Sequence, residues 1–417
     1  MSRTSTCRVS WVSVSRIAAP RCCPRAMFAR HRRARWRPLI RGSDARRVHR
    51  AVDRLLAAPR VRGASLSSGQ AGVALALHAL AASRDDDRAA RAARARMDRA
   101  IAAMARDRMS PWLFDGFAGI AWVAHHLFGD GAAEIDAVIA RAARVRSAPH
   151  ELCGGIAGLG VYALARPRAG LSGVLASLRG SAVRDADGLA WETPVALLPP
   201  GAVPPGARRH FNLGLAHGLP GVIGMLALAR TALAAGTAPG DPPAPRSGAA
   251  TSAELLDGAV RWLLAHRLPA AAAWRFPAWI DPGVPPIAAR QGWCYGDAAI
   301  ARVLWLAAHA ADEPSWRRVA LDTARRAAAA PLPPTGSLDA GLCHGSAGLG
   351  HIFNHHWQAT GERAFADAAR RWFDRTLARL DHLSSDGFLS GRAGVALALL
   401  HAVTAREPTW DRVLLLS

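Results

Sequence analysis

A short glycine phrase recurs along this chain and constrains its fold more than any other feature. Six copies read Gly-x-x-Gly, each followed by an apolar run rich in Ala and Leu. A seventh copy, Gly296-Asp297-Ala298-Ala299, has Ala where the second Gly should be. The first glycines lie 39 to 78 residues apart, and most intervals are near ~45 residues, which fits two helices with their turns. The six regular copies begin at Gly69, Gly116, Gly155, Gly218, Gly345 and Gly391.

The segments between the phrases predict a second, more polar set of helices. Residues 87–107, 314–330 and 361–380 are amphipathic, and 252–267 opens with Thr251-x-x-Glu254, a capping-box signature. Each repeat therefore pairs an apolar helix, entered through the glycine turn, with a polar helix outside it. Seven such hairpins can close into a ring whose glycine turns lie along one rim.

Composition supports a mostly helical protein and explains the charge. Hydrophobic residues make up 51% of 417 residues, and the formal net charge is +22. The chain contains no Lys, so the charge comes from Arg alone. We interpret it as the codon bias of a GC-rich genome and a solvated exterior, with a basic groove for an acidic peptide as the alternative, and we expect no nucleic-acid binding. The uncharged span 211–229 contains Asn212, His217 and Pro220 and is a poor membrane helix, so no integral membrane protein is expected.

The domain organisation is predicted to be simple. Residues 1–43 contain eleven arginines and no acid; they predict a disordered leader, or an overextended start with Met27 as one alternative initiator. Residues 44–417 are expected to form one domain, because the repeat resumes after each of two Pro-rich inserts, near 180–212 and 236–250.

The cysteines indicate a reducing compartment. Six occur in 417 residues, too few for a disulfide framework, so reduced thiols and a cytoplasmic protein are expected. Cys153 is interpreted as a small buried filler.

Three residues suggest a metal site. Cys294, Cys343 and His344 each lie close to a turn glycine, and two thiols with one imidazole suit zinc while leaving its fourth position open, as in catalytic sites. The alternative is two buried cysteines and a turn histidine.

The ordered phrases, together with Trp293-Cys294-Tyr295-Gly296, Cys343-His344-Gly345 and the LAHGLPG stretch at 215–221, resemble the lanthionine synthetase C-like family, the lantibiotic cyclases. The resemblance extends from about residue 45 to the C-terminus, whose residues 410–416 are similar to the ending of the stand-alone cyclases. No dehydratase-sized region precedes the cyclase body, so the stand-alone class is expected rather than the bifunctional one.

The resemblance implies an all-α (α/α)7 double barrel, or toroid, with glycine turns at the starts of the inner helices and a zinc ion at one mouth. It implies that Cys294, Cys343 and His344 bind the zinc, and that a peptide thiol is activated there as thiolate. His217 is the implied acid or base, with Arg290 stabilising an enolate and Tyr295 a second polar group. On the alternative interpretation His217 merely caps a turn and Arg290 is an ordinary surface residue.

Two departures from the family pattern concern Glu151 and Ala299. Glu151 stands where the family usually has Asp; it keeps a carboxylate that can orient His217 or the substrate, but one extra methylene could weaken catalysis. Ala299 replaces a glycine and is expected to require only a local backbone adjustment.

The leading hypothesis is a zinc-dependent cyclase that adds cysteine thiols of a dehydrated ribosomal precursor peptide to dehydroalanine or dehydrobutyrine, giving lanthionine and methyllanthionine rings. The alternatives are a non-catalytic peptide-binding scaffold of the same fold and an enzyme that adds glutathione to dehydrated protein residues. A separate dehydratase and an exporter are the further partners considered, and peripheral association with a membrane-bound biosynthetic complex is left open beside a free cytoplasmic protein.

Overall fold

The computed structural model describes residues 36–129, 133–145, 148–166, 170–194, 209–235, 246–333 and 338–417. Residues 1–35 of the predicted leader, the Pro-rich run at 199–205 and residues 236–245 of the second insert lie outside these ranges.

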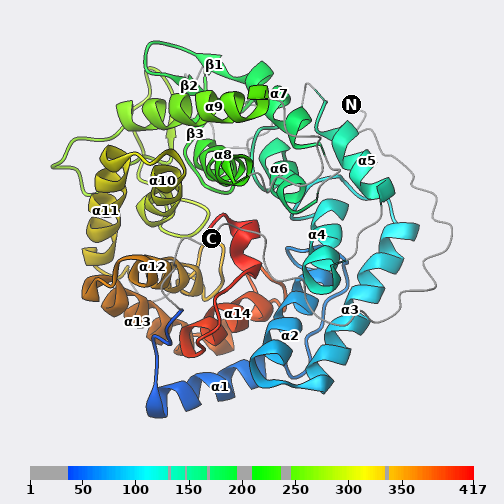
Figure 1. The fold of residues 1–417 in the computed structure, drawn as a ribbon. Coiled ribbons are helices and arrows are strands. Elements are labelled where there is room, and N and C mark those ends of the chain that lie inside the picture. The colour runs from blue at the N-terminus through cyan, green and yellow to red at the C-terminus, as the bar shows by residue number, and fades with distance from the viewer. Residues whose placement is uncertain are drawn as a thin grey trace.

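The described residues form two concentric rings of helices, the predicted all-α double barrel (Figure 1). The inner ring consists of α2 (Gln70–Arg84), α4 (Phe117–Phe128), α6 (Ile156–Ala165), α8 (Leu219–Ala234), α10 (Asp297–Ala311), α12 (Ser346–Thr360) and α14 (Arg392–Val403). The outer ring consists of α1 (Gly42–Leu56), α3 (Asp87–Arg106), α5 (Ala133–Ala142), α7 (Leu171–Ser181), α9 (Arg246–Ala265), α11 (Pro314–Ala329) and α13 (Arg363–Leu377).

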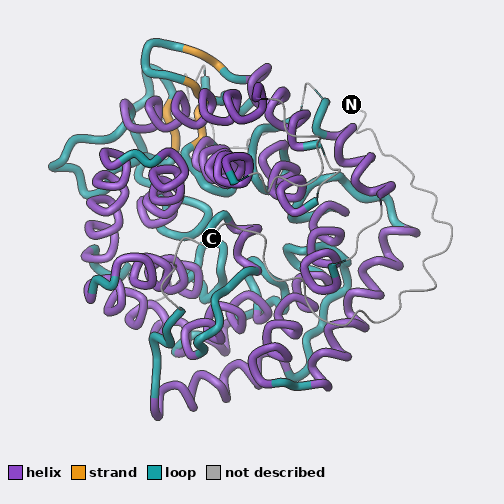
Figure 2. The backbone as a smooth tube through the Cα atoms, viewed as in Figure 1, coloured by secondary structure: helices purple, strands orange, loops and turns teal. Residues whose placement is uncertain are grey.

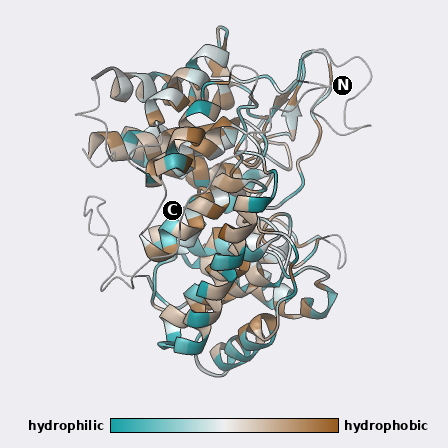
Figure 3. Ribbon diagram, turned by 90° about the vertical axis from the view of Figure 1, so that its right-hand side faces the viewer, coloured by the Kyte–Doolittle hydropathy of each residue, from teal (hydrophilic) through white to brown (hydrophobic). Residues whose placement is uncertain are grey.

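Hydrophobicity separates the two rings. Inner helix α14 is buried from Ala393 to Val403, whereas outer helix α13 buries only one face. Figure 3 shows hydrophilic and hydrophobic residues mixed along the helices that face the viewer in the side view. The inner helix α14 is therefore apolar nearly all round because protein covers it on every side.

The first and last helices close the barrel. No outer helix follows α14 in the chain, and α1 packs against it instead (Figure 1). The seventh hairpin thus joins the two ends of the domain rather than two neighbouring segments.

Two pairs of short strands lie in the connections between the described helices. β1 (Val183–Arg184) pairs with β2 (Leu189–Ala190), and β3 (Phe211–Asn212) pairs with β4 (Trp279–Ile280), both antiparallel. Figure 2 shows these strands beside α9. Within the described part of the first insert, the expected extended chain is therefore partly organised as hairpin.

One predicted helix start was wrong. The Thr251-x-x-Glu254 capping box does not begin a helix, because Thr251 lies inside α9, which is already helical from Arg246. Arg246, Ala249 and Ala250 favour helix and begin it before the capping signal, although Gly248 lies between them.

A closed circle of backbone hydrogen bonds joins the seven glycine turns. In each turn the residue two before the first glycine donates its N–H to the carbonyl of the corresponding residue in the next turn, and the last donates to the first, with N···O distances of 2.8–3.4 Å. We call these the ring residues: Ser67, Phe114, Cys153, Ala216, Cys294, Cys343 and Leu389.

Side chains alternate sharply on either side of the ring residues. The preceding residue is fully buried in all seven turns, at 0% exposure: Leu66, Leu113, Leu152, Leu215, Trp293, Leu342 and Phe388. The following residue is exposed or half-buried in all seven, and we call these the rim residues: Ser68, Asp115, Gly154, His217, Tyr295, His344 and Ser390. The extended turn therefore presents one side chain to the core and the next to the mouth of the barrel.

The second glycine of each phrase makes room for the turn itself. A Cβ at Gly119 would lie 1.9 Å from the carbonyl oxygen of Leu113, and one at Gly394 would lie 1.8 Å from that of Phe388. Ala299 occupies this place in the turn whose first glycine, Gly296, has a φ of +99°. The other six first glycines have φ between −113° and −152°, so a different backbone path accompanies the alanine, in line with the expected local adjustment.

The C-terminal segment fills the centre of the barrel. It runs through η3 (Trp410–Leu414), and Val413 to Leu416 are buried (Figure 1). Trp293 Nε1 donates to the Leu414 carbonyl at 2.8 Å, and Arg302 Nε donates to the Leu416 carbonyl at 2.7 Å. The helices that follow the Cys294 and Cys343 turns therefore pack around the end of the chain.

A buried carboxylate anchors this segment to α12. Asp411 Oδ2 lies 2.7 Å from His351 Nε2 and 2.6 Å from His355 Nε2, and Asp411 Oδ1 accepts from Ser417 Oγ at 2.7 Å. Asp411, His351 and His355 are all buried. Burial opposes ionisation of Asp411, but the two imidazoles outweigh it and hold the pKa of the carboxyl well below its usual value.

No described helix is long and apolar enough to cross a membrane.

We expect Asp411→Ala to lower the free energy of unfolding by roughly 3–5 kcal/mol, because it leaves two buried imidazoles without their shared acceptor. Asp98→Ala is the matched control; its exposed carboxylate pairs with Arg94, and its loss should cost less than about 1 kcal/mol. Urea unfolding of both variants measures the difference, and equal losses would contradict the anchoring role.

Acid should destabilise the fold through its buried histidines. Burial is the main cause that lowers the pKa of His150 and His401 to about 4 and that of His355 to about 3. Between about pH 6.5 and 4 the unfolded chain binds protons at these sites that the folded chain does not. We therefore expect the free energy of unfolding to be preserved above about pH 7 and to fall by up to about 1.4 kcal/mol per pH unit for each histidine below it. Urea titrations near neutrality and near pH 5.5 test this; equal or greater stability in acid would contradict it.

Candidate metal centre

Two consecutive ring residues bring the predicted metal ligands together. Cys294 N donates to the Cys343 carbonyl at 3.0 Å, so the two cysteines occupy the same position in neighbouring turns. His344 is the rim residue next to Cys343. The ligand atoms of the three side chains lie within 4.8 Å of one another, with Cys294 buried and the other two half-buried.

The two thiols polarise each other. A hydrogen bond from Cys343, supported by His344, outweighs burial and lowers the pKa of Cys294 to about 5, while the same hydrogen bond raises the pKa of Cys343. Thiolate character at Cys294 and a nearby imidazole are the electronic conditions under which a divalent metal is bound. The donor set of two sulfurs and one nitrogen suits a borderline-soft ion rather than Mg²⁺ or Ca²⁺.

Asp339 orients the imidazole of His344. Its Oδ2 lies 2.9 Å from His344 Nε2, and its Oδ1 accepts from Gly341 N at 2.7 Å. The hydrogen bond to Asp339, followed by that to Cys294, raises the pKa of His344 to about 9. With Nε2 directed to a carboxylate, Nδ1 is left to face the sulfurs, the arrangement typical of metal-binding histidines.

His217 and Glu151 form a second carboxylate–imidazole pair on the same rim. His217 Nδ1 lies 2.6 Å from Glu151 Oε2, and the His217 side chain remains 46% exposed. Desolvation lowers the pKa of His217, but the hydrogen bond and charge of Glu151 outweigh it, so the pKa is raised. The hydrogen bond to Glu151 occupies Nδ1, so Nε2 is the ring nitrogen left for other contacts.

Tyr295 and Arg290 supply further polar groups. Tyr295 Oη accepts from Asn212 Nδ2 at 2.7 Å, which leaves the phenol O–H available to donate. Burial is the main cause that raises the pKa of Tyr295, so the phenol stays protonated. Arg290 is exposed, and its charge helps to lower the pKa of Asp339.

Several residues of this site were missed at the level of sequence. Asn212, Arg290 and Asp339 share one place in the repeat, six residues before the first glycine. Of these three residues, the sequence pointed only to Arg290 as a site residue, through the resemblance to the family. Alignment of the seven turns would have shown that all three occupy the same position of the repeat.

Cys153 is a ring residue but not a member of the ligand cluster among the described residues. It is half-buried and packs against the core, and burial raises its pKa well above the usual value. Its thiol therefore stays protonated and resembles the predicted filler, though with partial exposure.

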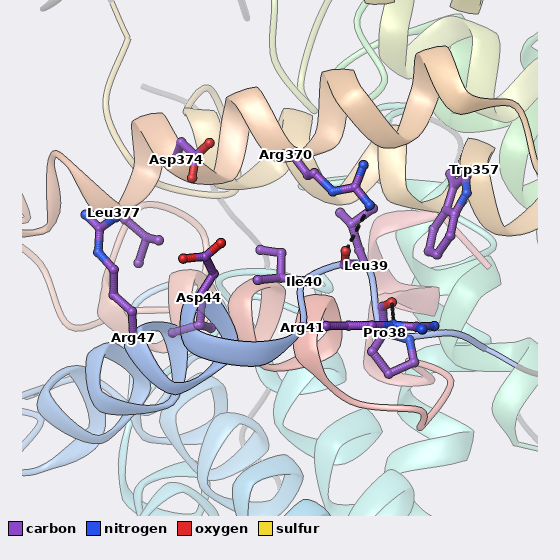
Figure 4. Close-up of a pocket in the computed structure, with 11 residues that line it drawn as sticks. Pro38, Leu39, Ile40, Arg41, Asp44, Arg47, Trp357, Arg370, Asp374 and Leu377 are labelled. Carbon is purple, nitrogen blue, oxygen red and sulfur yellow. Dashed lines mark hydrogen bonds between the residues drawn. The ribbon is translucent and has the colours of Figure 1, made fainter.

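A second histidine cluster and a cavity are distinct from this centre. His351 and His355 contact Asp411, a cluster that the sequence did not predict. A cavity of about 400 Å³ lies between residues 38–48 and α13, with none of the rim residues in its lining (Figure 4). There Arg370 donates to the Leu39 carbonyl at 3.2 Å, so the cavity lies where residues 38–48 pack against the rest of the barrel.

The protein is a helical barrel with a candidate metal centre. Two concentric rings of helices carry, on one rim, two thiols and two imidazoles that are each paired with a carboxylate. The chain belongs to the lanthionine synthetase C-like protein family, whose model matches residues 60–415.

Comparison of structures agrees on the fold. A nisin cyclase structure aligns with a TM-score of 0.67 at 18% identity, covering 90% of this chain and 98% of the other. An α-1,6-mannanase of Salegentibacter sp. HEL1_6 aligns with a TM-score of only 0.42 at 12% identity, covering 87% of this chain and 99% of the other. This similarity is too low to support a relationship. Among curated protein sequences, none matches this chain.

Proposed function

We propose that this protein is a zinc-dependent lanthipeptide cyclase. It adds cysteine thiols of a dehydrated precursor peptide to dehydroalanine or dehydrobutyrine residues of the same peptide and so closes thioether rings. The observation that carries the proposal is the convergence of Cys294, Cys343 and His344 on the rim that also holds the His217–Glu151 pair. Membership of the family supports the class of reaction.

The residues present fit a zinc ion. Cys294, Cys343 and His344 would hold it, and three protein ligands leave a fourth position for substrate. The mutual hydrogen bond of the two thiols joins groups that would repel one another as bare thiolates, so the pair is suited to a shared cation. Zinc, when bound, supplies the Lewis acidity that stabilises a peptide thiol as thiolate at neutral pH.

His217 is suited to the proton transfer. As the peptide sulfur bonds to the β-carbon of the dehydro residue, the π electrons of the C=C bond move through the α-carbon to the carbonyl oxygen as an enolate. The α-carbon then takes a proton, which the His217 imidazole in its protonated form can donate, since Glu151 accepts at Nδ1 and the ring is 46% exposed on the rim. The proton lost by the thiol restores the imidazolium, so ring closure is an isomerisation.

Tyr295 and Arg290 are suited to the developing oxyanion. The Tyr295 phenol remains a donor because Asn212 uses only its acceptor side, and the exposed guanidinium of Arg290 carries positive charge at the same rim. Donors aimed at a forming enolate stabilise the transition state more than the ground state. Glu151 in turn holds the His217 ring in one orientation.

The test combines metal content with peptide thiol counting. We expect about one zinc per chain in the wild type, loss of zinc in Cys343→Ala, and disappearance of thiols from a dehydrated precursor peptide without change of mass. Cys153→Ala is the matched control, since its thiol lies in the same ring outside the ligand cluster; it should retain both zinc and activity.

Other outcomes would redirect the proposal. Zinc bound with the peptide thiols untouched would favour the scaffold interpretation, and a mass increase equal to glutathione on a dehydrated protein would favour thiol addition. Absence of zinc in the wild type would contradict the ligand assignment.

Asp339→Asn should weaken zinc binding by about 10–100-fold, because the carboxylate that orients His344 is lost. Competition with a chromogenic chelator measures the affinity. Asp381→Asn, an exposed carboxylate in η2 (Leu380–His382), is the control; equal affinity of the two variants would show that Asp339 does not orient the ligand.

A further inference from the structure

One rim residue differs from the other six in having no side chain. Ser68, Asp115, His217, Tyr295, His344 and Ser390 each carry a polar group at this place in the turn, whereas the third turn has Gly154. The glycine there is not required by the backbone, because Gly154 is not among the residues with positive φ. Nor is it the first glycine of its phrase, which is Gly155.

The carboxylate of Glu151 fills the space that Gly154 leaves. A Cβ built on Gly154 would lie 2.8 Å from Glu151 Oε1, closer than real Cβ contacts allow. Its next neighbours are Trp112 Cδ1 at 3.9 Å and Glu151 Cδ at 4.0 Å, both ordinary contacts. The only group that a methyl at residue 154 would displace is therefore this carboxylate.

The same glycine also binds the carboxylate. Gly154 N donates to Glu151 Oε1 at 3.0 Å, while Glu151 Oε2 lies 2.6 Å from His217 Nδ1. One oxygen is fixed by the turn and the other by the imidazole, so the longer glutamate arm folds back over its own turn and still reaches His217. The carboxylate is half-buried at 23% exposure, and His217 is the more exposed partner.

We propose that Gly154 is a positioning residue of the site: its missing side chain admits the Glu151 carboxylate to the rim, and its N–H locks that carboxylate against His217. This inference deepens the proposed cyclase function and rests on it for the kinetic consequence. The geometry itself concerns only the Glu151–His217 pair, so it can also be tested without substrate.

Gly154→Ala should fold normally and retain zinc, because its one clash is with the end of a flexible side chain. We expect kcat for ring closure to fall by about 10–100-fold with KM little changed, since displacement of a catalytic group by about 1 Å has this effect. The pKa of His217, followed by NMR of the imidazole, should fall as its carboxylate partner moves away. Gly180→Ala is the matched control, because a Cβ there meets nothing within 4 Å.

Rescue by a shorter carboxylate separates positioning from general damage. In the Glu151→Asp background the carboxylate no longer reaches the space beside residue 154, so Gly154→Ala should there cost less than about 3-fold in kcat. Equal losses in both backgrounds would overturn the proposal, as would a Gly154→Ala variant with unchanged kcat and unchanged His217 pKa.

The NMR measurement distinguishes the two proposals. If the wild type closes no ring, the proposed function fails, but a lowered His217 pKa in Gly154→Ala still supports the positioning role. If rings close and the pKa is unmoved, the positioning role alone fails.

Discussion

The circle of seven backbone hydrogen bonds between the glycine turns is the constraint on which the rest of the structure depends. It uses only main-chain atoms, so the side chain of each ring residue is free to vary from Ser to Phe to Cys. It also fixes the spacing of neighbouring turns, and Cys294 and Cys343 are neighbours in it. The candidate metal pair therefore needs only two single-residue choices in a frame that already holds the two positions side by side.

The glycines are the cost of that frame. Each second glycine lies against the carbonyl oxygen of its own turn, at distances where a Cβ would overlap it. Glycine in a helix is less stable than alanine by roughly 1 kcal/mol. The glycine phrase is therefore locally unfavourable, and the close packing of the turn against the start of its helix compensates for it. The Ala299 turn makes the same point, since its alanine is accompanied by the positive φ of Gly296.

The sequence predicted the repeat and the inner helix starts because both are written in local spacing around glycine. The three candidate ligands that it named lie together in the structure, and their binding of zinc stays a prediction. It did not predict the pairing of α1 with α14 or the contact of Asp411 with His351 and His355, which join segments with no shared pattern. The capping signal at Thr251 failed because α9 already begins at Arg246, five residues earlier in the chain. Asp339 and Asn212 were missed for a different reason: their signal appears only when the seven turns are aligned.

The filled centre of the barrel determines where chemistry can occur. Val413 to Leu416 are buried inside the inner ring, and the Trp293 and Arg302 side chains hold their carbonyls. The chain's own C-terminal segment therefore occupies the centre of the inner ring. The two carboxylate–imidazole pairs lie on the rim with the thiols, so in the proposed reaction the acid, the thiol site and the oxyanion donors would share that rim. Because each of these groups is attached to the hydrogen-bonded circle, their relative positions are set before any substrate arrives, which is the preorganisation that transition-state stabilisation requires.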